Sequence, residues 1–164
     1  MALNLKAMLA NPGIRAQLFE SMDPEDREDL LRTEHTPDSQ EFLADMADAM
    51  FFDFSECVLT LVSNPGNRRD PDEVWVHRWH GQYFVYSSQA DLSGPYASAE
   101  KAFEVGTLDV NAVDSVITGC LPFDQMVAMA SEVTSDDGDT TLIEGARYGW
   151  VGGEFREVEG EGEV

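Results

Sequence analysis

The spacing of hydrophobic residues divides the chain into a helical front and a β-rich back. Apolar positions recur at helical spacing in residues 2–10 and 13–21, two short segments separated by a proline–glycine turn. Asp23-Pro24 and Thr36-Pro37 each place an N-cap residue before a proline at the first helical position. The pattern therefore predicts three to four helices, of which the longest covers about 37–54.

The predicted 37–54 helix has one purely anionic stripe. Its four acids are spaced three, four and three residues apart: Asp38, Glu41, Asp45 and Asp48. An apolar side opposes them, formed by Leu43, Met46, Ala47, Met50 and Phe54. Like charges at this spacing destabilise a helix by roughly 0.2–0.5 kcal/mol per pair, and no Lys or Arg at that spacing offsets them. A solvated face is the default interpretation, but the uncompensated cost favours a function.

The middle of the chain predicts a three-stranded β-meander. Residues 57–62 are rich in β-formers, and Glu73–Trp79 alternates with Val74, Val76 and Arg78 on one face and Trp75, His77 and Trp79 on the other. His80-Gly81-Gln82 turns the chain into a third strand over 83–86, and Gly94-Pro95 is expected to end the β-structure.

The C-terminal half is less regular. Ser98 is positioned to cap a short helix at about 99–104, whereas 113–117 fits either a strand or the start of a helix. Residues 122–132 have a helical pattern. The chain then predicts a two-stranded hairpin, with strands at 140–148 and 154–158 joined by a turn at 151–153.

These elements predict the α+β class. An acidic helical segment, 1–56, is expected to pack with a small antiparallel sheet in 57–158, built from the meander and the C-terminal hairpin. The two parts are expected to form one compact domain, a size that fits 164 residues. Residues 159–164 are expected to be a disordered acidic tail.

The charge of the chain is far from that of an ordinary globular protein. Thirty-two Asp and Glu face ten Lys and Arg, which gives a formal net charge of −22. Residues 20–56 alone hold thirteen acids and two arginines. A hydrophobic content of 43% with sixteen aromatic residues nevertheless argues against a disordered acidic chain. Such a field repels nucleic acid and anionic membranes and attracts basic surfaces.

Cysteine content and the N-terminus bear on location. Cys57 and Cys120 are the only cysteines, too few for a disulfide framework, and we expect both to be reduced and buried in a cytoplasmic protein. The N-terminal apolar run is too short for a signal peptide, and no run of about 20 apolar residues predicts a membrane span.

No recognisable catalytic constellation appears, so we expect neither enzymatic activity nor a cofactor. His35 lies in a predicted loop, and His77 and His80 are expected on opposite faces of a strand. The one weak metal-like segment offers Asp137, Asp139 and Glu144 around Gly138. In an EF-hand loop aligned on that glycine, however, Val133 would occupy the first ligand position, which requires a side-chain oxygen.

The leading functional hypothesis is a non-enzymatic acidic binding or inhibitor protein. It would occupy a basic, nucleic-acid-binding surface of a partner, such as a nuclease, by mimicking nucleic acid. Small acidic inhibitors, including anti-CRISPR, anti-restriction and toxin-immunity proteins, share this composition but no motif of this chain. The candidate partner-binding residues are Asp23, Glu25, Asp26, Glu28, Asp29, Asp38, Glu41, Asp45 and Asp48.

Two alternatives stay open. In one, the acids keep a cytosolic domain of a halophile soluble, which fits two lysines against eight arginines, although residues 57–131 carry only nine acids against four bases. In the other, a small-ligand or enzyme domain uses the aromatic strip of Trp75, Trp79, Tyr83 and Tyr86, a pattern more typical of a core.

Overall fold

Helices form the N-terminal third of the chain in the computed structural model, which describes residues 3–63, 72–108, 114–134 and 140–158. They are α1 (Leu5–Leu9), α2 (Pro12–Glu20), α3 (Pro24–Thr33) and α4 (Pro37–Phe54). Prolines open α2, α3 and α4, and the Thr36 side chain accepts a hydrogen bond from the Ser39 N–H at the start of α4. The predicted starts of α3 and α4 are confirmed.

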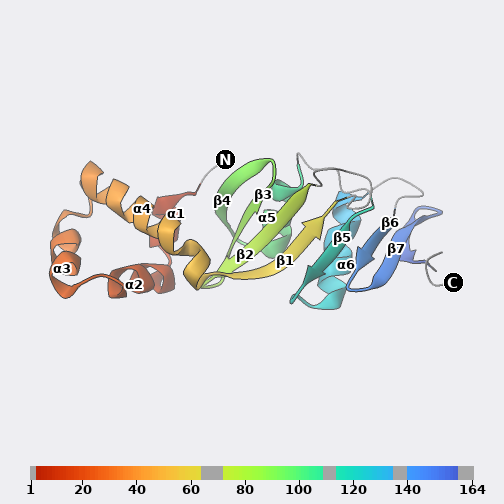
Figure 1. Cartoon of the computed structure of the whole chain (residues 1–164), viewed down its shortest axis with the longest axis horizontal. Coiled ribbons are helices and arrows are strands. Elements are labelled where there is room, and N and C mark those ends of the chain that lie inside the picture. The colour runs from red at the N-terminus through yellow and green to blue at the C-terminus, as the bar shows by residue number, and fades with distance from the viewer. Residues whose placement is uncertain (1–2, 64–71, 109–113, 135–139, 159–164) are drawn as a thin grey trace.

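The remainder forms a sheet of eight strands in the order β4-β3-β2-β1-β5-β6-β7-β8. The strands are β1 (Glu56–Val62), β2 (Glu73–Trp79), β3 (Gln82–Ser87), β4 (Ala90–Tyr96), β5 (Val116–Gly119), β6 (Thr140–Ile143), β7 (Ala146–Val151) and β8 (Glu154–Glu157). Figure 1 shows α1–α4 at one end of this sheet and the C-terminal strands at the other. The predicted α+β class is confirmed, although the sheet is larger than expected.

The ambiguous segment resolves into a strand and a helix. Residues 116–119 form β5, and α6 (Phe123–Val133) carries the chain across to β6, which pairs with β5 in parallel. A parallel pair requires such a crossover, and the other strand pairs are antiparallel. The expectation of a purely antiparallel sheet was therefore wrong, because β6 runs in the same direction as β5.

The expected end of the meander at Gly94-Pro95 was also wrong. Strand β4 continues through this dipeptide and pairs with β3, so the meander has four strands. Pro95 is tolerated because β4 is the edge strand, where a missing N–H breaks no ladder on the outer side. Gly94 has a φ of +133°, and a Cβ there would lie 2.8 Å from Phe84 Cδ2 and 2.9 Å from the Tyr83 carbonyl oxygen.

The C-terminal hairpin is a three-stranded meander instead. Glu144 and Gly145 have φ values of 48° and 87° and turn β6 into β7, dividing the predicted first strand. Positive φ at both central residues is the signature of a tight hairpin turn. Predicted turns at His80-Gly81 and Gly152-Gly153 are confirmed by the same signature, and the tail at 159–164 lies outside the described residues.

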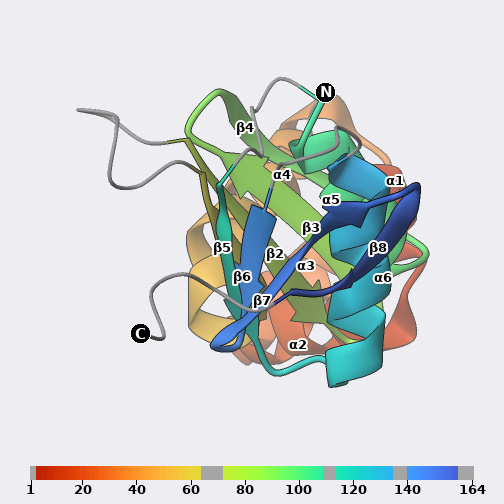
Figure 2. The ribbon, with the colours of Figure 1, turned by 90° about the vertical axis from the view of Figure 1, so that its right-hand side faces the viewer.

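One face of the sheet packs on α5 (Ala99–Gly106) and α6, as Figure 2 shows. Val74, Val76 and Val85 from the strands join Phe103 and Met126 from the helices in a single buried cluster. Since Val74 and Val76 face this cluster, the predicted alternation of β2 is confirmed on that side.

The opposite face of the sheet packs on the N-terminal helices at one end only. Phe51 of α4 is fully buried there, with ring centroids 5.9 Å from Trp79 and 5.0 Å from Phe84. Both pairs are edge-to-face, a favourable aromatic geometry. This cluster, which also includes Ile14 and Leu18 of α2, joins the helical segment to the sheet.

No α-helix in the described residues combines the length and apolar character needed to cross a membrane.

Replacing Phe51 by alanine should lower the free energy of unfolding by about 3–5 kcal/mol, because it opens a cavity where α4 meets the sheet. Its neighbour Phe52 is 53% exposed, so Phe52→Ala should cost only about 1 kcal/mol. Urea unfolding followed by helical circular dichroism and by tryptophan fluorescence measures both effects.

The same experiment tests the one-domain prediction. The three tryptophans lie in β2 and β7, whereas much of the helical signal comes from α1–α4. A single domain requires the two transitions to coincide. If Phe51→Ala and Phe52→Ala lowered the free energy of unfolding equally, the proposed role of Phe51 in joining α4 to the sheet would be contradicted.

Candidate functional site

The acidic stripe lies on the outer face of α4. Asp38, Glu41, Asp45 and Asp48 are all exposed, whereas Leu43, Ala47 and Phe51 on the other side of the helix are buried. The last acid of the stripe lies ten positions after the first, so the stripe runs about 15 Å along the helix axis. The stripe is thus an extended row of carboxylates that starts near α3 and ends beside the sheet (Figure 1).

These four carboxylates have no neutralising partner within the described part of the chain. Its ion pairs lie elsewhere: Arg15–Glu34, Arg32–Asp29, Arg78–Glu56 and Lys101–Glu104. Of the predicted α3 contact acids, Asp29 is paired with Arg32, and the other four, Asp23, Glu25, Asp26 and Glu28, are also exposed. Within the described residues, eight of the nine predicted contact acids are thus exposed without an ion pair, and the four on α4 form a single row along one helix.

An ion pair joins the end of α3 to α2. The Arg15 guanidinium donates two hydrogen bonds to the Glu34 carboxylate, at 2.8 and 2.9 Å. These bonds lower the pKa of Glu34 below its ordinary value and raise that of Arg15. Arg15 also lies over the Phe19 ring, 4.7 Å from its centroid. This bidentate contact holds the α3–α4 connection against α2.

Exposed phenylalanines, which were not among the predicted contact residues, accompany the acids. Phe42 is 48% and Phe52 53% exposed. Each lies four residues after an acid of the stripe, Asp38 or Asp48, and this spacing could have placed them on the outer face. Phe54, expected on the apolar side, is 40% exposed because α4 ends there and the chain turns into β1.

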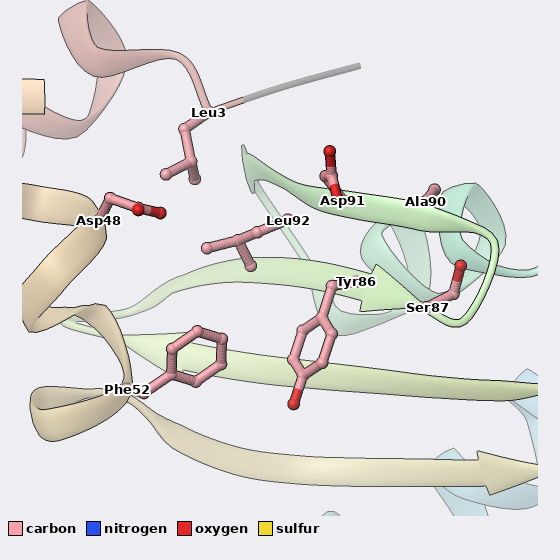
Figure 3. A pocket seen from close by; sticks show the side chains of 8 residues that line it. All are labelled: Leu3, Asp48, Phe52, Tyr86, Ser87, Ala90, Asp91 and Leu92. Carbon is pink, nitrogen blue, oxygen red and sulfur yellow. The ribbon is translucent and has the colours of Figure 1, made fainter. Parts of the chain in front are cut away.

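A pocket of about 620 Å³ opens where the acidic stripe ends. It lies between the C-terminal half of α4, the β3–β4 hairpin and the start of the chain. Figure 3 shows the rings of Phe52 and Tyr86 side by side in front of the strands, with Leu92 and Leu3 above them. Two carboxylates, Asp48 and Asp91, also line it.

The aromatic wall of the pocket is built from contacts between strands and helix. Tyr86 stacks on Trp75 of the neighbouring strand, with centroids 4.7 Å apart and an angle of 16°. Phe52 meets both Tyr86 and His77 edge-on, at 5.4 Å in each case. These contacts fix the position of the Phe52 ring although half of its surface faces solvent.

The predicted aromatic strip does not lie on one surface. Trp75 and Tyr86 are half-buried on the pocket side of the sheet, but Trp79 is only 2% exposed beneath the N-terminal helices. Tyr83 pairs across the strands with Arg78 and packs against the core under α5 and α6. Of the four, Trp75 and Tyr86 are thus partly exposed on the pocket side of the sheet, whereas Trp79 is covered and Tyr83 lies on the other side.

His77 and His80 have separate surroundings. His77 is 7% exposed, its Nδ1 lies 3.0 Å from the Ser55 hydroxyl, and burial lowers its pKa. His80 lies in the β2–β3 turn, where its Nε2 is 2.9 Å from Gln17 Oε1. The two imidazoles therefore have structural partners of their own.

The candidate metal segment lies mostly outside the described residues, which exclude Asp137 and Asp139. Glu144 is in the β6–β7 turn, where its carboxylate accepts a 2.7 Å hydrogen bond from the Gly119 N–H. This bond ties the turn to the end of β5 and gives Glu144 a structural role. Within the ranges that the structure describes, no three metal-ligating side chains gather at one point.

Both cysteines are free and exposed, so the expectation that they are buried was wrong. The register of β1 against β2 shifts between Cys57 and Leu59, and this bulge buries Val58 while Cys57 stays at the surface. Cys120 follows the last residue of β5, where the chain leaves the sheet for α6. A one-residue bulge reverses the outward or inward direction that alternation alone assigns.

No protein-family model, curated protein or solved structure matches this chain.

The buried His77 should make stability fall in mild acid. The unfolded chain binds a proton on this residue near pH 6.5, whereas the folded state binds it only at lower pH. Between the two pKa values the unfolded state holds more protons, so the free energy of unfolding decreases as the pH falls. Above about pH 6.5 both states are neutral at this site and the effect disappears.

Urea unfolding at pH 7.5 and 5.5 tests this on wild type, His77→Gln and His35→Gln. The wild type and the His35→Gln control should each lose more stability on acidification than His77→Gln, which lacks the titrating group. An identical pH dependence for wild type and His77→Gln would remove His77 as the cause.

Proposed function

We propose that this protein is a non-enzymatic inhibitor that covers a basic, nucleic-acid-binding surface of a partner protein. The observation that carries the proposal is the outer face of α4. It presents four exposed carboxylates without an ion pair in the described chain, interspersed with the half-exposed Phe42 and Phe52. A surface that combines uncompensated charge with exposed aromatic rings is suited to binding another protein.

The charge pattern supports a basic partner. Successive acids on α4 are about 4.5–6 Å apart along the axis, against about 3.4 Å between phosphates on one DNA strand. The acids are therefore more widely spaced than phosphates. They still form a row of negative charges, which is complementary to a basic groove that binds a nucleic-acid strand. The net charge of −22 would also accelerate encounter with a basic surface, and salt would weaken that effect.

Phe42 and Phe52 would provide apolar contact area, which the carboxylates alone do not. Exposed ion pairs contribute about 0–1 kcal/mol each because water and salt screen them, whereas buried aromatic anchors dominate interface energies. Phe42 and Phe52 flank the acids along the helix and would lose their exposed apolar surface on contact. Partners of the right kind are nucleases, including RNA-guided and restriction enzymes, DNA-binding regulators and basic toxins.

A displacement assay tests the proposal. Labelled duplex DNA bound to each of a panel of such basic proteins should be released by the wild type from at least one member at about 0.15 M salt. Reversing Asp38, Glu41, Asp45 and Asp48 to lysine should weaken this release at least about 30-fold, assuming about 0.5 kcal/mol for each lost contact.

A matched variant separates location from net charge. Reversal of Glu104, Glu132, Glu154 and Glu157, which are exposed on other elements, gives the same formal charge of −14, since each change adds two. It should stay within about threefold of the wild type. If both variants lost the same DNA-displacing activity, the net charge of the protein, and not the position of the acids on α4, would be the cause. Failure to displace DNA from every panel member, with folding that requires molar salt, would favour the halophile alternative instead.

A further inference from the structure

We propose that the pocket beside α4 receives one arginine side chain from the basic surface of the partner. The inference rests on the proposed function, because the acidic stripe would bring that surface to the pocket. Asp48 links the two: it is the last acid of the stripe and also lines the pocket. A partner aligned along α4 would therefore place a side chain directly over the opening.

The lining of the pocket is complementary to a guanidinium group. Phe52 and Tyr86 offer aromatic surface, and Asp48 and Asp91 offer carboxylates. None of the described residues that line the pocket is basic. A guanidinium is planar and less strongly hydrated than an ammonium, stacks on aromatic rings and donates paired hydrogen bonds to carboxylates. This combination favours arginine over lysine and over an uncharged side chain.

The walls are already in place before a ligand arrives. Trp75 supports Tyr86 from the next strand, and Phe52 is held by edge-on contacts with Phe51, His77 and Tyr86. Binding therefore need not order these rings, which keeps its entropic cost low. The volume of about 620 Å³ lies within the range of ligand pockets, about 300–1,000 Å³, and leaves room for the backbone beside the arginine.

A second pocket shows which features matter. It lies between α5 and α6, has a volume of about 190 Å³ and is lined by Glu100, Glu104 and Glu132. Its only aromatic residue, Phe103, is 1% exposed, so no ring face is open to a cation. Carboxylates line both pockets, whereas an exposed aromatic ring beside them separates the α4 pocket from this second one.

The test uses four-repeat peptides, acetyl-(Ser-Arg)₄-amide and the same peptide with lysine or with citrulline, the uncharged analogue of arginine. Affinities are measured by calorimetry at low salt on the full chain. The arginine peptide should bind at least about threefold more tightly than the lysine peptide, and the citrulline peptide should not bind measurably.

Two matched pairs of variants locate the binding. Phe52→Ala should weaken binding of the arginine peptide at least about fivefold and abolish the preference over lysine. Phe123→Ala removes a 39% exposed ring at the start of α6, outside the proposed contact surface, and should change the affinity less than about twofold. Asp91→Asn should weaken binding about threefold, and Glu132→Gln, at the second pocket, should have no effect. Phe52→Leu, which keeps an apolar side chain but removes the ring, replaces Phe52→Ala if the latter does not fold.

Three results would overturn the pocket assignment: equal losses of affinity for Phe52→Ala and Phe123→Ala, equal affinity for the arginine and lysine peptides, or binding of the citrulline peptide. The proposed function survives that failure if reversal of the four α4 acids still abolishes DNA displacement. Conversely, if no panel protein releases DNA while Phe52 and Asp91 still control the arginine peptide, the pocket stands and the inhibitor function fails.

Discussion

The packing of Phe51 between α4 and the sheet sets the orientation of the acidic stripe and the position of Phe52. Its ring is fully buried against Trp79 and Phe84, so the helix can rotate little about its own axis. With Phe51 inward, the helical period turns the acids outward. The next residue, Phe52, falls at the edge of the cluster and reaches Tyr86. One buried aromatic contact thus sets both the orientation of the acidic stripe and the wall of the pocket.

Charge and apolar surface act together at this end of the molecule. The carboxylates of α4 would draw a basic surface in from a distance, and the aromatic residues would hold it once water is displaced. The stripe has a small cost in helix stability, since its like charges repel and no cation in the described chain offsets them. The buried face of α4 outweighs that cost, because the apolar contacts of Leu43, Ala47 and Phe51 are far larger.

Sequence patterns predicted the features that depend on neighbouring residues. The prolines and caps gave the starts of α3 and α4, the periodicity gave the acidic stripe, and alternation gave the inward face of β2. Features that depend on distant contacts were not predictable in this way. The parallel pairing of β5 with β6 and the continuation of β4 through Pro95 follow from sheet order, and the exposure of Cys57 follows from a bulge. The pocket requires α4 and β4 to meet, and the local pattern contains no sign of that.

Carboxyl footprinting of a complex tests the central claim most directly. Carbodiimide coupling of an amine to exposed carboxylates, located by mass spectrometry, would compare the free protein with the protein bound to a basic partner. The account predicts strong protection of Asp38, Glu41, Asp45 and Asp48 together, with labelling of Glu104 and Glu132 on the opposite side of the sheet unchanged. Unaltered labelling of the four α4 acids in a stable complex, or protection confined to α5 and α6, would contradict it.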